Sequence, residues 1–357
     1  VKMPQEVRIA TFNCENLFGR PKIFKSSAER STLLLGYVAE LQAELKKDVF
    51  DQQRIKDIKA KLSGFAKVND TRGRHTTGGV GADDWIGWVE LTRKPADSMA
   101  VTNTARVIAD TEADVICLVE VESRPTLEAF HNNVLNSAFL KSRGKASYEH
   151  IMLIDGNDGR GIDVAVMSRF PINWMRSHMD DTTTYQGKTV KTFSRDCLET
   201  KISLPGGRDL VLMANHLKSK GYSPPTDPTS KIRRQGQAAR LSSILDEYDL
   251  SRDLVVVAGD LNDYPSGGSL DLLINKPKLY NVNLELKVAD QGTYHSGSKQ
   301  IDYLLVSEAL KQGLKEVIVN RQGMFTKSTR KWTMYPEVTS QTTEASDHAS
   351  VTAVFEI

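Results

Sequence analysis

The sequence predicts an α/β fold built on a mixed β-sheet, and two features of the chain support this. Seven short runs rich in aliphatic and β-branched residues indicate strands, and longer segments with apolar residues at helical spacing lie between some of them. Other strand-like runs follow one another without an intervening helix, which favours antiparallel neighbours beside the parallel pairs that helices connect.

The strands are expected where the hydrophobic pattern is clearest. Residues 6–13 (EVRIATFN) alternate, whereas 113–121 (ADVICLVEV) form a near-continuous apolar run, typical of a strand buried on both faces. The remaining strands are expected at 162–168, 209–216, 253–260, 301–307 and 349–357. Helices are expected at 99–113 and 230–250, and Gly236 is the one weak position of the second.

One segment interrupts the alternation of strands and helices. Residues 26–68 contain two highly charged stretches with helical periodicity, and a polar, glycine-rich stretch follows them. About ninety residues therefore separate the first expected strand from the next one. We expect a single domain spanning residues 1–357, with a mostly helical insertion at about 20–95.

Composition excludes several classes of protein. Lys and Arg number 47 and Asp and Glu 45, so the total charge gives no argument for nucleic acid binding. No apolar stretch approaches the ~20 residues that span a bilayer. The first residues lack a signal-like core, and both a cytoplasmic location and secretion after loss of a signal peptide fit a soluble chain. Three cysteines do not make a disulfide framework, and no feature indicates an obligate protein partner.

Polar residues gather where the expected strands begin or end. Ends of strands converge on one edge of an α/β sheet, so these side chains are expected to form a site. Taken singly, each is as well explained by a cap, a turn or a solvated loop, and only the joint occurrence is informative. The set comprises Asn13, Glu15, Glu120, Asn215, His216, Asp260, Asn262, Asp263, Asp302, Asp347 and His348.

The chemistry available to this set is narrow. Carboxylate and amide oxygens favour Mg²⁺ or Mn²⁺ over Zn²⁺, and the chain has neither an HExxH motif nor a Cys/His cluster. P-loop and GxGxxG signatures are also absent. The strand ends offer no Ser, Cys or Lys nucleophile, so water is the expected nucleophile. A metal and a histidine beside an anionic substrate suggest in-line attack on phosphorus.

The order of motifs resembles the endonuclease/exonuclease/phosphatase superfamily of metal-dependent phosphoesterases, which is related to pancreatic-type deoxyribonucleases and abasic-site endonucleases. The matching segments, spread over residues 8–348, are TFNCENL, DVICLVEV, GIDVAVMSR, ANHLKSK, VVVAGDLND, IDYLLVS and SDH. The resemblance is closest to bacterial nuclease-type members. It implies a four-layered α/β sandwich, in which two mixed β-sheets pack face to face between flanking helices.

The resemblance also implies a metal site. Glu120 matches the main ligand of the ion, and Asn13 and Glu15 match positions that support the ion and its waters. Asp347 matches an acid beside the metal. The implied cofactor is Mg²⁺ or Mn²⁺, with Ca²⁺ as a possible supporting ion.

Catalytic roles follow from the same resemblance. Asp260 and Asn262 match the pair that positions the attacking water and the scissile phosphate. Asp302 matches the acid that orients a histidine, which would be His348. His216 matches a position that contacts the phosphate. Whether Asp260 or His348 is the formal base, and whether one or two ions act, stays open.

The substrate expected from the sequence is nucleic acid, with DNA favoured. Arg160, Asn215 and Lys218 are candidates for substrate contacts. A cationic groove for the backbone has further candidates in Lys220, Arg233, Arg234 and Arg240, although charges on a helix are more often only solvated. A phosphatase or phospholipase-C-type phosphodiesterase acting on inositol phosphates or sphingomyelin is the main alternative. A non-catalytic binding module on the same fold is the second.

Overall fold

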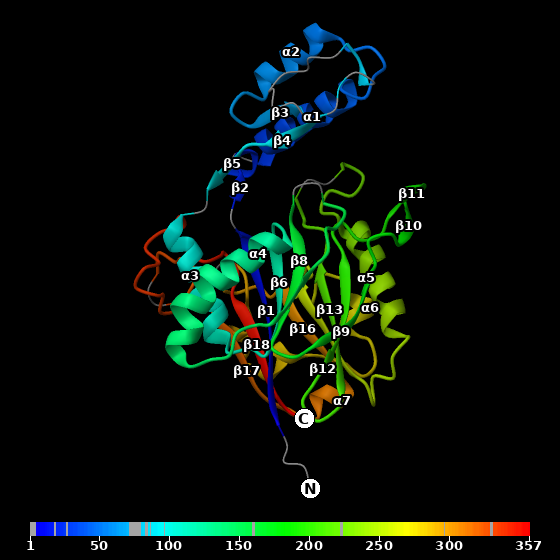
Figure 1. Ribbon diagram of the computed structural model, residues 1–357. Helices are drawn as coiled ribbons and strands as arrows, with labels where there is room; N and C mark the ends of the chain where they lie inside the picture. The colour runs from blue at the N-terminus through cyan, green and yellow to red at the C-terminus, as the bar shows by residue number, and fades with distance from the viewer. Residues whose placement is uncertain are drawn as a thin grey trace. The chain divides into compact units, whose positions relative to one another are not determined.

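The computed structural model describes residues 5–17, 19–25, 28–70, 80–82, 85, 87–95, 97–158, 161–221, 224–295, 297–328 and 331–357. The chain divides into two units, one containing Val1–Phe18 and Asp97–Ile357 and the other containing Gly19–Ala96. The larger unit carries two six-stranded sheets (Figure 1).

The first sheet has β1, the strand nearest the start of the chain, close to its centre. Its order is β17-β18-β1-β6-β8-β7, and only β1 and β6 run parallel. The strands are β1 (Glu6–Leu17), β6 (Val115–Val121), β7 (His150–Leu153), β8 (Asp163–Ser168), β17 (Leu314–Asn320) and β18 (Ser350–Glu356).

The second sheet repeats this plan, with one parallel pair near its centre. Its order is β15-β16-β14-β13-β12-β9, and β13 and β14 are the parallel pair. The strands are β9 (Ile172–Ser177), β12 (Cys197–Ser203), β13 (Asp209–His216), β14 (Leu254–Asp260), β15 (Leu279–Asn281) and β16 (Asp302–Ser307). A separate hairpin joins β10 (Thr182–Tyr185) to β11 (Lys188–Lys191).

The two sheets pack face to face between layers of helices. Alternate residues of β6 and β14, such as Cys117 and Val256, enter a shared inner core, and their neighbours Ile116 and Val257 face outer cores. Both strands are therefore apolar on both faces, as their sequences predict. The predicted four-layered α/β sandwich is confirmed (Figure 1).

Helices cover the outer faces of the two sheets. The first sheet is covered by α3 (Ser98–Thr111), α4 (Arg124–Phe130) and the π-helix η3 (His131–Leu140), which continues into η4 (Lys141–Arg143). The second is covered by α5 (Lys231–Leu245) and α6 (Asp271–Ile274). The short elements α7 (Glu308–Lys311), η5 (Val282–Glu285) and η6 (Val288–Asp290) complete the unit. Within the described part of the chain, every helix is too short or too polar to cross a bilayer.

The smaller unit has its own hydrophobic core, formed by residues such as Leu41, Ile55 and Trp85. Its two helices carry the charged stretches seen in the sequence, and two short antiparallel strand pairs accompany them. The elements are β2 (Gly19–Pro21), η1 (Lys22–Lys25), α1 (Ala28–Glu44), α2 (Gln52–Lys61), β3 (Ala66–Asp70), β4 (Gly87–Leu91) and β5 (Arg93–Pro95). Treating this unit as an insertion into one phosphoesterase domain remains our proposal.

A buried polar network ties the end of β9 to β12. The Glu199 side chain is 0% exposed and accepts hydrogen bonds from Arg176 Nε at 2.8 Å and from the Tyr248 hydroxyl. The ring of His178 lies between two carboxylates, with Nε2 3.0 Å from Glu199 Oε2 and Nδ1 2.9 Å from Asp181 Oδ2. Although burial opposes ionisation, these partners lower the pKa of Glu199 to about 2.

Replacing Glu199 by Gln is expected to cost about 3 kcal/mol of unfolding free energy at pH 7, because it removes the charge that the network binds. The wild-type contribution is present above the unfolded pKa of 4.5 and is lost as the pH falls toward 2. Urea unfolding of both proteins from pH 7 to pH 3 checks this. The variant should lack that part of the pH dependence.

Glu247→Gln is the matched control, because Glu247 pairs with the same Arg176 at 2.7 Å but is 46% exposed. Its cost should stay below about 1 kcal/mol. Equal losses in Glu199→Gln and Glu247→Gln would contradict the assignment of stability to the buried carboxylate.

Candidate active site

Strand register brings the predicted polar residues to one edge of the sandwich. His216 lies opposite Asp260 in the β13–β14 pair, and Asp260 lies opposite Asp302 in the β14–β16 pair. In the other sheet, Asn13 near the end of β1 lies opposite Val119 near the end of β6. The adjoining strand β18 begins two residues after His348. Both sheets therefore deliver side chains to the same edge.

The backbone leaves regular strand geometry at the key positions. Glu15, Glu120 and Asn262 have left-handed φ values of 49°, 63° and 54°. Shifts in register accompany the first two, between Asn13 and Leu17 in β1 and around Glu120 in β6. Residues other than glycine adopt this region at a cost, and such residues cluster at functional sites as well as at turns and helix caps. Such bulges re-aim side chains at sheet ends.

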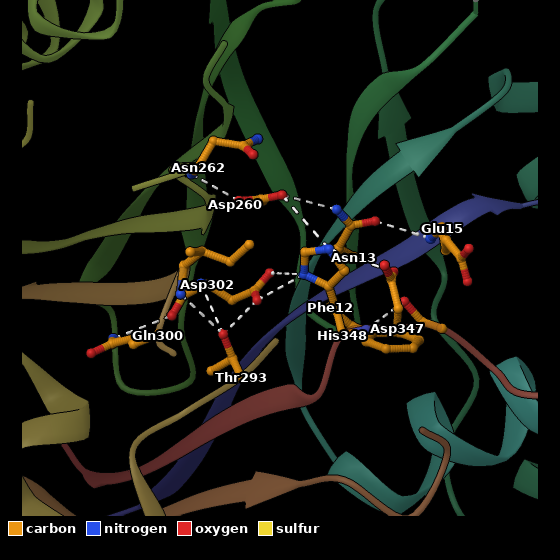
Figure 2. A network of polar contacts seen from close by, with 12 residues as sticks. Phe12, Asn13, Glu15, Asp260, Asn262, Thr293, Gln300, Asp302, Asp347 and His348 are labelled. Atoms are coloured by element: carbon orange, nitrogen blue, oxygen red, sulfur yellow. Dashed lines mark hydrogen bonds and ion pairs between the residues drawn. The ribbon is translucent and has the colours of Figure 1, made fainter. Parts of the chain in front are cut away.

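His348 is held in place by Asp302 (Figure 2). Its Nδ1 lies 2.9 Å and 3.1 Å from the two Asp302 carboxylate oxygens, and the Thr293 hydroxyl donates to Asp302 Oδ2 at 2.6 Å. The His348 amide donates to Ser346 Oγ at 3.0 Å. Burial alone would lower the pKa of His348, but Asp302, with Asp347 and Asp260, raises it well above the usual value. The imidazole Nε2 therefore faces Asp260 and Asp347 in a fixed orientation.

Asp260 lies at the centre of the group. Its Oδ2 accepts a hydrogen bond from Asn13 Nδ2 at 3.1 Å, and its Oδ1 accepts one from the backbone N–H of Asn262 at 2.8 Å (Figure 2). The same Oδ2 lies 3.8 Å from His216 Nε2 and 4.0 Å from His348 Nε2. Burial and the Asp302 charge raise the pKa of Asp260 to about 7. The carboxyl group can therefore exchange a proton near neutrality.

Gly259 allows β14 to carry Asp260 into this position. It has a φ of 130°, and a Cβ atom there would lie 1.9 Å from the carbonyl oxygen of Asn215. Only glycine fits this close approach between β14 and β13. The close approach of the two strands thus explains why glycine precedes Asp260 in the GDLND motif.

Three further carboxylates border the same space. Glu120 Oε1 lies 3.9 Å from His216 Nε2, and Asp347 Oδ1 lies 3.7 Å from His348 Nε2. The backbone N–H of Glu15 donates to Asn13 Oδ1 at 2.9 Å, and the Glu15 carboxylate contributes to raising the pKa of the nearby Tyr294 phenol. The site therefore gathers acidic groups around two imidazoles.

These groups form a candidate metal centre. Asp260, Asp302 and His348 each place one ligand atom within 4.8 Å of the others. The phenol of Tyr294 lies close to these groups. Burial raises its pKa well above the usual value, and so do the negative charges of four site carboxylates, Asp347, Asp260, Glu15 and Glu120. A buried site this negative fits a divalent cation, and oxygen donors suit Mg²⁺ or Mn²⁺.

Of the predicted substrate contacts, Asn215 lies away from the site. Asn215 is 0% exposed, and its side-chain amide donates to Met213 O of its own strand at 3.0 Å. Asn215 lies two residues after Met213, whose side chain packs in the outer core of the second sheet. Because side chains alternate along a strand, Asn215 also faces outward, whereas His216 faces the site. Lys218 places its Nζ 2.8 Å from Gly221 O in its own loop. Arg160 lies outside the described residues.

Each arginine of α5 has a partner within the protein. Arg234 is 1% exposed and donates to Lys218 O and Thr229 O at 2.9 Å, so it supports the loop from inside. Arg240 binds Asp181 at 2.7 Å, and Arg233 donates to the Lys191 carbonyl. Their positions on a helix gave no sign of these partners, and the prediction of a cationic face there is wrong for Arg234.

The structure adds two residues that the sequence did not single out. The Thr293 hydroxyl accepts from the Asp302 amide at 3.1 Å while donating to its carboxylate. The Tyr294 ring lies 4.7 Å from the His348 ring. Both belong to GTYH, an irregular segment with no periodicity. The only signal was its position just before the strand that starts at Asp302.

Comparison with known proteins agrees with this architecture. The family described as "Endonuclease/Exonuclease/phosphatase family" matches residues 88–348. Three solved bacterial structures with endonuclease/exonuclease/phosphatase titles share the fold. The protein from Bacteroides thetaiotaomicron is 14% identical with a TM-score of 0.53, covering 100% of both chains. That from Bacteroides vulgatus is 12% identical with a TM-score of 0.51, covering 99% of both.

The third structure, from Beutenbergia cavernae, is 17% identical with a TM-score of 0.52, covering 99% of this chain and 72% of its own. No curated protein matches the chain in sequence. The family match covers most of the chain, and the site holds a buried Asp–Asp–His candidate metal cluster. The chain therefore belongs to the endonuclease/exonuclease/phosphatase family and is a phosphoesterase.

Proposed function

We propose that this phosphoesterase is a divalent-metal-dependent nuclease that hydrolyses phosphodiester bonds, with DNA as its substrate. The observation that carries the reaction type is the relation between Asp260 and His348. Their facing atoms are 4.0 Å apart, which is too far for a direct hydrogen bond. One oxygen atom hydrogen-bonded to both groups would bridge this distance.

Asp260 and His348 have complementary proton chemistry. The pKa of Asp260 is about 7, so its carboxylate can accept the proton of an attacking water. The contact with Asp302 raises the pKa of His348 and so favours its protonated form, whose Nε2 would donate to a phosphoryl oxygen and stabilise the charge there. Asn262, whose side-chain Nδ2 donates to Leu217 O at 3.1 Å, would orient the phosphate.

The cation is assigned to the carboxylates on the side of β1 and β6. Both oxygens of Asp302 already contact His348, which favours an orienting role for Asp302. Glu120, Glu15 and Asp347, with the Asn13 amide, would then hold Mg²⁺ or Mn²⁺. When bound, the ion neutralises charge that develops on the phosphate and the leaving oxygen. His216, near Glu120, would contact the leaving group.

DNA as the substrate rests on a finer resemblance. The segments NHLKSKG (215–221) and RGIDVAVMSR (160–169) resemble bacterial nuclease-type members more than phosphatases or sphingomyelinases. Inositol phosphates and sphingomyelin are the substrates to test against it.

A substrate panel tests this proposal. Supercoiled DNA, linear DNA, RNA, inositol phosphates and sphingomyelin are each incubated with Mg²⁺ or Mn²⁺, with and without EDTA. DNA should be cleaved only when the ion is present, and excess Mg²⁺ should restore the activity lost to EDTA. Turnover of the small phosphoesters alone, or cleavage that resists EDTA, would overturn it.

A further inference from the structure

Two isolated β-bridges through Tyr294 link His348 to an exposed lysine, Lys299. Tyr294 forms antiparallel bridges with His348 on one side and with Lys299 on the other. Each bridge spans about one strand spacing of ~4.8 Å, so the backbone of Lys299 lies within roughly 10 Å of that of His348.

The same lysine lies beside the loop that follows Asp260. Its Nζ is 4.8 Å from the centre of the Tyr264 ring, and Lys220 Nζ is 3.7 Å from that centre. Tyr264 follows the GDLND motif, and its amide is fixed by Asp263 Oδ1 at 3.0 Å. Three loops of the site thus place two ammonium groups over one ring.

The two lysines differ in how their charge is compensated. Lys220 Nζ lies 2.8 Å from Asp263 Oδ1, so part of its charge is neutralised locally. Lys299 is exposed and, among the described residues, makes no ion pair with a carboxylate. The cationic rim, defined here as Lys220, Lys299 and Tyr264, borders a strongly acidic centre. Such a centre repels a polyanion unless positive charge at its edge offsets the repulsion.

We propose that the cationic rim is a binding subsite for a backbone phosphate next to the scissile one, with Lys299 as its main contact. This deepens the proposed function on which it rests, because it makes the enzyme selective for polymeric diesters over small ones. A substrate without a neighbouring phosphate has nothing for Lys299 to bind.

The test compares a DNA oligonucleotide with bis(4-nitrophenyl) phosphate, a small diester, over a range of KCl concentrations. Lys299→Met should raise KM for the oligonucleotide about fivefold and make the slope of log(kcat/KM) against log[salt] less steep by about 0.7–0.9. The small diester should be affected much less. Lys299→Arg should keep the wild-type salt slope.

Lys315→Met is the matched control, because Lys315 pairs with Glu356 at the far end of β18. It should leave both substrates and the salt slope as in the wild type. An unchanged oligonucleotide KM and salt slope in Lys299→Met, or equal losses on both substrates, would overturn the subsite. These outcomes require a wild-type enzyme that cleaves DNA, so they are distinct from failure of the proposed function.

Discussion

His348→Gln is expected to lower kcat for phosphodiester hydrolysis by about 10³-fold while leaving the fold intact. Glutamine occupies a similar volume but cannot carry the charge that Asp302 stabilises on the imidazole. Steady-state kinetics at saturating Mg²⁺ and the melting temperature of each protein measure the two effects separately. Near-normal, metal-dependent activity in this variant would contradict the assignment of His348 as a catalytic residue.

Asp302→Asn tests the contribution of the Asp302 charge while the imidazole ring of His348 stays present. The amide keeps the shape of the side chain but loses the charge that raises the pKa of His348. We expect about a 10²-fold loss of kcat with His348 still in place. His150→Gln serves as the control, because His150 in β7 pairs with Ser168 at the opposite end of the first sheet. Its activity should match the wild type.

Asp260→Asn is expected to abolish activity and yet stabilise the metal-free protein. An unfolded Asp titrates near pH 4, whereas the pKa of Asp260 in the fold is about 7. The folded state therefore binds more protons between these values, so stability of the metal-free wild type falls as pH rises from about 4 to about 7. At pH 8 the variant should melt several degrees higher in EDTA.

Two comparisons make this prediction specific. Mg²⁺ should raise the melting temperature of the wild type more than that of Asp260→Asn, since binding to the folded state alone stabilises it. Asp263→Asn should instead lower the melting temperature, because Lys220 and Ser269 hold the pKa of Asp263 below its usual value despite burial. A lower melting temperature for metal-free Asp260→Asn would contradict the account.

The sequence predicted the fold best where a strand is apolar on both faces. The expected runs at 113–121 and 253–260 correspond closely to β6 and β14. β12 was not expected, because CLETKIS contains Glu199 and Lys201. The partners that make Glu199 acceptable in a core, Arg176 and His178, come from a separate segment. A strand whose charges are neutralised by distant residues cannot be recognised from its own pattern.

Within the candidate site, residues at strand ends were also easier to predict than residues in irregular segments. Residues carried on strand ends, such as His216, Asp260 and Asp302, meet because register places them together. Residues in irregular segments were harder to predict. Neither the turn of Lys218 toward Gly221 O nor the contact of Thr293 with Asp302 follows from periodicity. The roles of the individual site residues stay predictions until the variants are measured.

The position of β18 between β17 and β1 has a consequence for biosynthesis. Its partner β1 precedes the other described strands of the two sheets, whereas β18 and the adjacent His348 follow all of them and are therefore synthesised later. Such distant pairing makes assembly slow. A nascent chain therefore carries no finished hydrolytic centre, and recovery of catalysis during refolding reports the docking of this last strand.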